Sequence, residues 1–172
     1  MLLYYDSKLP VRLMTNEISK PSTKYRTAAA ALVVSAATLV GIAANEGYVG
    51  TAYKDVVGVP TIGFGETKGV RAGQTTTPVR ALIQLEKSMN EYAAGVAKCT
   101  TAPISQNEFD AYVSFSYNLG VGAYCNGPAK LVNQGKYEEA CKRILLYDHA
   151  GGKVYPGLTK RRQEEYKTCM GE

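Results

Sequence analysis

Residues 46–67 read EGYVGTAYKDVVGVPTIGFGET, the most informative stretch of the sequence. Between residues 53 and 65, β-branched and aromatic side chains are interrupted by three glycines and Pro60. This pattern predicts a short, twisted hairpin. The residues from 66 to 76 are polar and rich in glycine, which predicts a loop after the hairpin.

The chain beyond this loop carries the signals of a helical lobe. A Thr-Pro pair at 77–78 predicts a helix that runs to about residue 98. Ser105 and Glu108 form a capping box, which predicts a second helix that ends at the glycines 120 and 122. A small sheet followed by helices predicts an α+β fold that is mainly α. Three further helices are expected over 128–134, 137–147 and 159–170.

Length and charge set limits on the class of protein. The chain has 172 residues, 45% of them hydrophobic and 20% charged, which is ordinary for one folded domain. The net charge is +5, but residues 1–26 hold five basic and two acidic side chains. Residues 45–172 hold fifteen basic and thirteen acidic ones, an excess too small to indicate a nucleic-acid partner.

An uncharged segment, TAAAALVVSAATLVGIAA, covers residues 27–44. As a helix its 18 residues span about 27 Å, just enough for the core of a bilayer. Lys24 and Arg26 flank its N-terminal side, so the positive-inside rule puts residues 1–26 in the cytoplasm and the chain from residue 45 outside. Residues 1–23 are expected to be a flexible tail in which Met1 and Met14 are alternative starts.

The segment is nevertheless weakly hydrophobic, because only six of its residues are Leu, Val or Ile. A stable transmembrane anchor, a signal peptide cleaved near Ala44 and a weak anchor that later releases all fit it. A buried alanine-rich core helix of a soluble protein is a fourth reading. Composition alone ranks the signal peptide and the weak anchor level, with the core helix behind.

Four cysteines, at positions 99, 125, 141 and 169, all follow this segment on the side expected to be exported. An even count in an oxidising compartment predicts two disulfides, with three pairings possible. Four reduced thiols in a cytosolic protein are the alternative. The chain has one His and no CxxC pattern, so no metal site and no cofactor is expected.

Glu46, Asp55 and Thr61 are the candidate catalytic residues. Glu46 follows the apolar segment and the other two lie on the hairpin, so a helix end and a hairpin can bring them around one cleft. Glycoside hydrolysis needs one protonated and one ionised carboxyl group in different environments. A partly desolvated helix end favours the protonated form, and a glycine-rich hairpin leaves a carboxylate solvated. Ordinary surface acids remain the alternative for both.

The order Glu, eight residues, Asp, five residues, Thr resembles the catalytic triad of phage-type lysozymes (glycoside hydrolase family 24). SQNEFDAYVSFSYNLGVGAY, from residue 105, resembles the central helix of that family. YDHAGGKVYPGLTKRRQEEYKTC, from residue 147, resembles its C-terminal stretch with a double Arg. The resemblance covers about residues 40–170. The chain departs from it at Pro60, where many relatives have Trp, and at Glu66, where many have His.

This resemblance implies a lysozyme-like fold with a small hairpin lobe and a larger helical lobe, in which residues 45–172 are the catalytic domain. It implies an endolysin that cuts the β-1,4 bond between N-acetylmuramic acid and N-acetylglucosamine in peptidoglycan for host cell lysis. Glu46 would be the general acid, and Asp55 with Thr61 would activate water, with inversion. Tyr117 would line the sugar cleft, although core packing explains it equally well. The resemblance also implies a monomer with Cys141–Cys169 and Cys99–Cys125 bridges.

Some members of this family begin with a signal-anchor-release segment, which residues 27–44 resemble. Glu46 needs a helix beneath it, so we expect the segment to be retained and to join the domain on release. The protein would first lie in the host inner membrane, inactive, and then in the periplasm. The rival functions are a lytic transglycosylase acting on the same bond, an inactive membrane-tethered wall-binding module, and a structural membrane protein.

Overall fold

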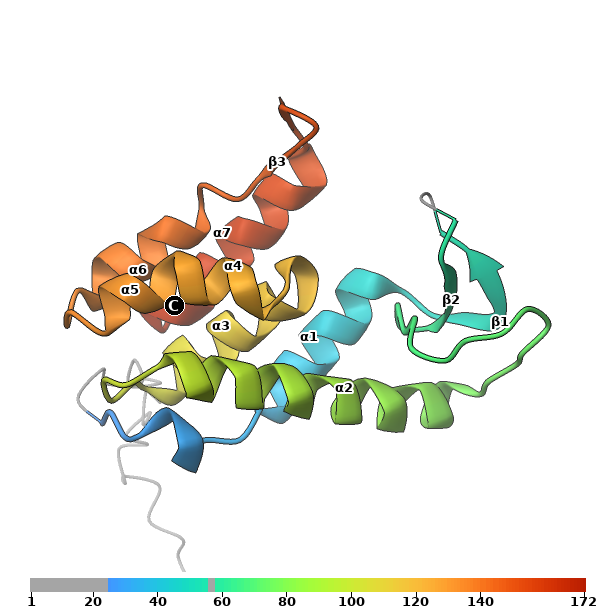
Figure 1. The fold of residues 1–172 in the computed structure, drawn as a ribbon, viewed down its shortest axis with the longest axis horizontal. Coiled ribbons are helices and arrows are strands. Elements are labelled where there is room, and N and C mark those ends of the chain that lie inside the picture. The colour runs from blue at the N-terminus through green and yellow to red at the C-terminus, as the bar shows by residue number, and fades with distance from the viewer. Residues whose placement is uncertain (1–24, 56–57) are drawn as a thin grey trace, which may run out of the picture.

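The structure, a computed structural model, describes residues 25–55 and 58–172. It has a hairpin lobe and a larger helical lobe, and the long helix α2 (Pro78–Cys99) runs along both (Figure 1). The α+β, mainly α class predicted from the sequence is confirmed. The tail expected over residues 1–23 lies outside the described residues.

The apolar segment differs from the single helix expected over 27–44. It forms a 3-10 turn, η1 (Ala29–Ala31), then an extended stretch, then helix α1 (Ala36–Glu46). Ser35 begins α1 by accepting the backbone N–H of Thr38 at 3.2 Å. The backbone N–H of Ser35 in turn donates to Asp110 at 3.0 Å, which fixes the break between the two helices. Within the part of the chain that the structure describes, no helix is long and apolar enough to cross a membrane.

The hairpin joins β1 (Val49–Lys54) to β2 (Pro60–Gly63) in antiparallel register. Tyr53 lies opposite Thr61, and Lys54 lies opposite Pro60. Pro60 is the first residue of its strand, where a missing N–H costs least. The first strand begins earlier than predicted, because a register irregularity between Val49 and Tyr53 lets the chain pair again nearer to α1.

Both predicted helix starts are confirmed. Thr77 accepts the backbone N–H of Arg80 at 3.3 Å, and Pro78 is the first residue of α2. Helix α3 (Gln106–Leu119) begins at a complete capping box. In it Ser105 accepts the N–H of Glu108 at 3.2 Å, and Glu108 accepts the N–H of Ser105 at 2.8 Å.

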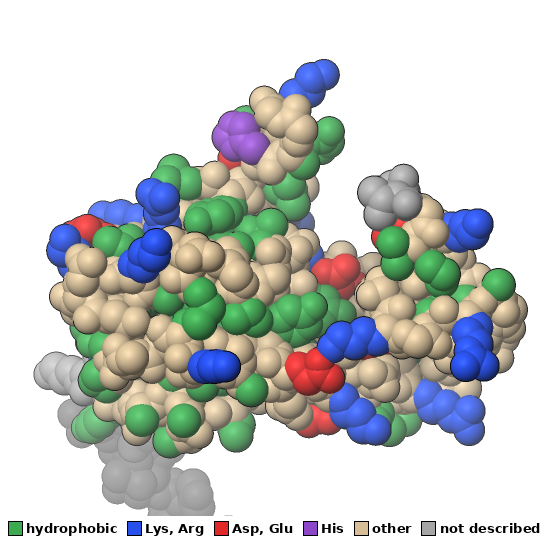
Figure 2. Space-filling view, in the orientation of Figure 1, with side chains coloured by type: hydrophobic (Ala, Val, Ile, Leu, Met, Phe, Trp, Pro, Cys, Tyr) green, Lys and Arg blue, Asp and Glu red, His purple; other side chains and the backbone are tan. Residues whose placement is uncertain are grey.

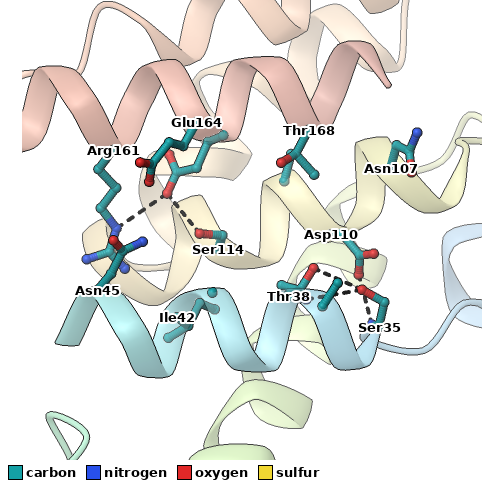
Figure 3. A pocket seen from close by; sticks show the side chains of 14 residues that line it. Ser35, Thr38, Ile42, Asn45, Asn107, Asp110, Ser114, Arg161, Glu164 and Thr168 are labelled. Carbon is teal, nitrogen blue, oxygen red and sulfur yellow. Dashed lines mark hydrogen bonds and ion pairs between the residues drawn. The ribbon is translucent and has the colours of Figure 1, made fainter. Parts of the chain in front are cut away.

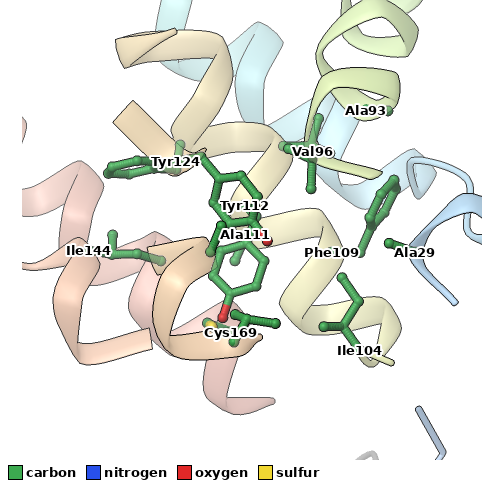
Figure 4. Packing of buried hydrophobic residues seen from close by; sticks show 14 of the residues in the cluster. Ala29, Ala93, Val96, Ile104, Phe109, Ala111, Tyr112, Tyr124, Ile144 and Cys169 are labelled. Atoms are coloured by element: carbon green, nitrogen blue, oxygen red, sulfur yellow. The ribbon is translucent and has the colours of Figure 1, made fainter. Parts of the chain in front are cut away.

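The hydrophobic core surrounds α3, which runs through the helical lobe. Tyr112 and Phe109 of α3 are at most 1% exposed, and Val96 of α2 is completely buried. Figure 4 shows these side chains packed with Ile144, which comes from the C-terminal half of the chain. Because a buried helix needs covering on all sides, α3 is held by helices from both ends of the sequence.

The C-terminal half contains four further helices: α4 (Val121–Asn126), α5 (Pro128–Val132), α6 (Tyr137–Ile144) and α7 (Pro156–Met170). Helix α4 was not predicted, because Gly122 was expected to end a helix and instead lies inside one. The small ladder of β3 (His149–Ala150) with β4 (Lys153–Val154) was also not predicted. Disulfides join Cys99 to Cys125 and Cys141 to Cys169, the pairing that the resemblance implied.

Candidate active site

Glu46 is the last residue of α1, at the boundary between the two lobes. Gly47 ends the helix with a φ of 71°, which turns the chain away toward the hairpin. The carboxylate then faces the loop after β2, where a Cβ at Gly65 would lie 3.2 Å from Oε2 of Glu46. The site therefore needs a residue without a side chain at position 65, and 23% of the Glu46 side chain stays exposed.

Arg161 of α7 contacts the same carboxylate from the other side. Its Nη1 donates to Oε1 of Glu46 at 2.8 Å, and its side chain is 11% exposed. A charge-assisted hydrogen bond in a partly buried place fixes the orientation of the carboxylate. The double Arg at 161–162 is part of the resemblance to phage-type lysozymes, and no local pattern in the sequence points from it to Glu46.

Asp55 and Thr61 are held on the hairpin through a shared neighbour, Val59. Oδ1 of Asp55 accepts the N–H of Val59 at 2.8 Å. The hydroxyl of Thr61, which is 4% exposed as a residue, donates to the carbonyl of Val59 at 3.0 Å. The backbone of Val59 therefore binds both side chains.

Two adjoining pockets, of about 240 Å³ each, lie between the lobes. Glu46 lines one of them, and Glu66, Lys68 and Tyr117 line both. Figure 2 shows this face hollowed between the lobes, with an acidic patch in the hollow. The structure thus brings Glu46 and Tyr117 into one groove, whereas Asp55 and Thr61 lie on the hairpin and do not line either pocket.

Tyr117 lines the groove and also packs against neighbouring side chains. Its hydroxyl donates to the carbonyl of Phe64 at 3.0 Å, and its ring meets the edge of Tyr92 at a centroid distance of 5.3 Å. Burial, with the nearby charges of Glu46 and Glu66, raises the pKa of Tyr117 well above its ordinary value. The hydroxyl therefore stays a donor and ties α3 to the loop after β2.

Glu66, the second carboxyl group of the groove, accepts two hydrogen bonds at each of its oxygens. Oε1 accepts the backbone N–H groups of Thr67 and Lys68 at 2.9 and 2.7 Å. Oε2 accepts from Gln84 at 3.2 Å and from Ser88 at 2.5 Å. Burial raises the pKa of Glu66, but these hydrogen bonds together outweigh burial and hold the pKa below its ordinary value. Glu66 therefore stays ionised and organises the loop, which makes it a poor proton donor.

A family model described as phage lysozyme matches residues 43–165 of the chain. The chain belongs to the phage lysozyme family. It is accordingly a glycoside hydrolase, a muramidase, whose substrate is peptidoglycan.

Individual relatives agree with this family. The SAR-endolysin of Pseudomonas phage phiKMV is 35% identical over 139 residues, which cover 78% of this chain and 87% of that one. The SAR-endolysin of Enterobacteria phage PA-2 is 30% identical over 159 residues, which cover 87% of this lysozyme and 96% of the relative. The solved endolysin of Escherichia coli O157:H7 phage FAHEc1 superposes with a TM-score of 0.74 at 30% identity, over 85% and 96% of the two chains.

The chemistry open to this lysozyme follows from its side chains. Among residues 25–55 and 58–172, no group of three His, Cys, Asp or Glu side chains is placed to hold a metal ion. The groove instead offers Glu46, a carboxyl group that Arg161 orients. A second carboxylate, Asp55, lies on the adjacent hairpin. Two carboxyl groups in unlike surroundings suit acid-assisted cleavage of a glycosidic bond.

Proposed function

We propose that Glu46 is the general acid of this lysozyme and that Asp55, with Thr61, positions the attacking water. The observation that supports the first role is the placement of Glu46 in the groove, oriented by Arg161 at 2.8 Å. Its proton would pass to the glycosidic oxygen as the bond to the anomeric carbon breaks. The competing acid in the groove, Glu66, is tied down by four hydrogen bonds.

The water would attack the anomeric carbon from the hairpin side and pass its proton to Asp55. The hydrogen bonds that the backbone of Val59 makes with both Asp55 and Thr61 support this role, because they orient the two side chains. Attack from the face opposite the leaving group inverts the anomeric centre and leaves a reducing end on N-acetylmuramic acid. A lytic transglycosylase would instead leave an anhydro ring at that end.

Purified peptidoglycan digested by the wild type and by Glu46→Gln tests these roles. The amide keeps the shape of the side chain but has no proton to donate, so activity should fall by a factor of about 10²–10⁴ or more. Glu91→Gln is the matched control, because Glu91 is an exposed acid of α2 that pairs with Lys68. Near-wild-type activity of a folded Glu46→Gln variant would remove Glu46 from the mechanism. Anhydro ends in the products would instead establish transglycosylase chemistry.

We further propose that residues 27–44 hold the new protein in the host inner membrane and later join the folded domain in the periplasm, where the monomeric enzyme lyses the host. Relatives of this lysozyme that are SAR-endolysins support this proposal. So does the shallow docking of the segment. Ile42 is the one residue of α1 buried below a tenth exposure, whereas Val40 is 63% and Val33 is 75% exposed.

Arg26 gives this proposal a physical basis. It precedes the apolar segment on the side expected to be cytoplasmic, yet in the folded domain it binds Glu108 through two hydrogen bonds of 2.7 and 3.1 Å. Its guanidinium also lies 3.7 Å from the ring centre of Tyr137. A chain that spans the membrane between Arg26 and Glu46 would separate Arg26 from Glu108. The tethered and folded states would therefore exclude each other.

A further inference from the structure

Behind Glu46 lies a cavity of about 250 Å³ between α1, α3 and α7, lined by both polar and apolar side chains. Arg161 reaches into it from α7, and Ser114 and Asp110 reach into it from α3 (Figure 3). Asn45, the neighbour of Glu46, lines it from α1. The cavity thus borders the far side of the ion pair that orients Glu46.

Glu165 is a buried acid of this cavity, with 4% of its side chain exposed; Asp110 is the other. Its Oε1 accepts from the hydroxyl of Ser114 at 3.0 Å and from Nη2 of Arg162 at 3.2 Å. Its Oε2 lies 2.9 Å from Nε of Arg162. Nε of Arg161 lies 3.5 Å from Oε1, an ion pair without hydrogen-bond geometry.

The four charged groups therefore alternate in sign from the groove inward: Glu46, Arg161, Glu165 and Arg162. A general acid must be protonated to act, but a positive charge at 2.8 Å favours the ionised carboxylate. In a partly buried place this attraction is poorly screened. A negative charge on the opposite side of Arg161 opposes this attraction and makes it easier for the Glu46 carboxyl group to keep its proton.

We propose that Glu165 is a positioning residue that divides the charge of Arg161 between two carboxylates, so that Arg161 orients Glu46 without holding it ionised. This inference rests on the proposed role of Glu46 as the general acid. It assigns a function to the acid that follows the double Arg by three residues, which the sequence analysis left without one.

The surroundings of Glu165 allow it to supply that charge near neutral pH. Burial raises its pKa, and the charges of Arg162 and Arg161 with the Ser114 hydrogen bond lower it, which leaves the pKa at about 6. The other acids lining the cavity are Asp110, which binds Ser35 and Gln106, and Glu164, which is half-exposed. The side chains that line the cavity from α1 are uncharged.

The test is the pH–activity profile of Glu165→Gln on purified peptidoglycan. Without the charge at 165, Arg161 should hold Glu46 ionised to a lower pH. The basic limb of the profile should then move down by about half a pH unit or more, which is about threefold less activity on that limb. Glu164→Gln is the matched control, because it removes the same charge from the adjacent, solvated position and should leave the limb in place.

An unmoved limb in folded Glu165→Gln, or an equal movement in Glu164→Gln, would overturn the inference. If Glu165→Gln does not fold, an NMR titration of the wild type tests the inference instead. In ¹³C-carboxyl NMR spectra recorded against pH, the Glu46 resonance should show an added inflection near pH 6, where Glu165 titrates, and its absence would overturn the inference. Activity of Glu46→Gln separates this outcome from failure of the proposed function, because that variant tests the general acid without reference to Glu165.

Discussion

Nη1 of Arg161 and Oε1 of Glu46 are 2.8 Å apart although the two residues are separated by 115 positions in the sequence. The last turn of α1 and the first turns of α7 meet at this ion pair, so helices from both ends of the chain position the candidate acid. Anything that undocks α1 therefore also takes Glu46 away from the residue that orients it.

Arg161→Met should move the basic limb of the pH–activity profile in the direction opposite to Glu165→Gln. The substitution keeps the bulk of the side chain but removes the charge that favours ionised Glu46, so the basic limb of the pH–activity profile should move up. Activity at the optimum should fall about tenfold, because the carboxyl group loses its orientation. Arg143→Met, at an exposed position of α6, is the control. A limb that stays in place would show that Arg161 does not act on the proton of Glu46.

Glu165 should make the domain lose stability as the pH rises from about 4.5 to 6. Its folded pKa, about 6, lies above the ordinary value of 4.5, so in this window the folded state binds a proton that the unfolded state has released. The contribution, present below pH 4.5 and lost above pH 6, is about 2 kcal/mol. Urea unfolding at pH 4 and pH 7 measures it. Glu165→Gln should lose that much less stability than the wild type between the two pH values, and equal losses would contradict the shift.

The two disulfides should differ in their resistance to reduction. Cys141 and Cys169 are 1% and 2% exposed, whereas Cys99 and Cys125 are half-buried. Mild reductant without denaturant should therefore open Cys99–Cys125 first, as mass spectrometry after alkylation would reveal. Each bridge should stabilise the fold by about 2–4 kcal/mol. Simultaneous loss of both bridges would indicate global unfolding before reduction.

Arg26→Ala should destabilise the folded domain. It leaves the carboxylate of Glu108, whose side chain is 3% exposed, without its ionic partner and removes the contact with Tyr137. The expected loss is about 2–3 kcal/mol in chemical unfolding, below the range for a fully buried pair because Glu108 keeps its capping bonds. Lys142→Ala, which breaks the exposed pair with Glu138, should leave the stability unchanged within error. Similar effects of both variants would mean that Arg26 is only a surface charge.

Replacing Ala36, Ala37 and Gly41 with Leu should keep the protein in the membrane. All three positions are exposed in the folded domain, and a Cβ at Gly41 would meet nothing within 4 Å, so we expect the variant to fold. They raise the cost of leaving the bilayer by about 25 cal/mol for each Å² of added apolar surface. Fractionation should find the variant in the membrane and lysis delayed, whereas the same positions changed to Ser should speed release. A soluble, active species beginning at Asn45 would instead identify a cleaved signal peptide.

Much of the fold could be predicted because its signals are local. Thr77 with Pro78, and Ser105 with Glu108, begin helices by bonds within one turn, so their spacing in the sequence is sufficient. The break at Ser35 could not be predicted in the same way. It depends on the carboxylate of Asp110, 75 positions away. Helix α4 was missed because Gly122 costs little in a short helix that its neighbours cover.

For the candidate site, the residue types and their order could be read from the sequence: Glu46 after an apolar segment, Asp55 and Thr61 on a hairpin, and a double Arg near the end. Which of these residues are in contact follows only from the folded arrangement of the helices. In the folded protein Arg161 binds Glu46, and four donors bind Glu66. Glu165 lies buried on the other side of Arg161. A carboxyl group's proton affinity depends on burial and on the charges and donors a few ångströms away. For Glu165 these neighbours come from α3 and α7, and for Glu66 they come from its own loop and from α2. Only folding brings these elements together.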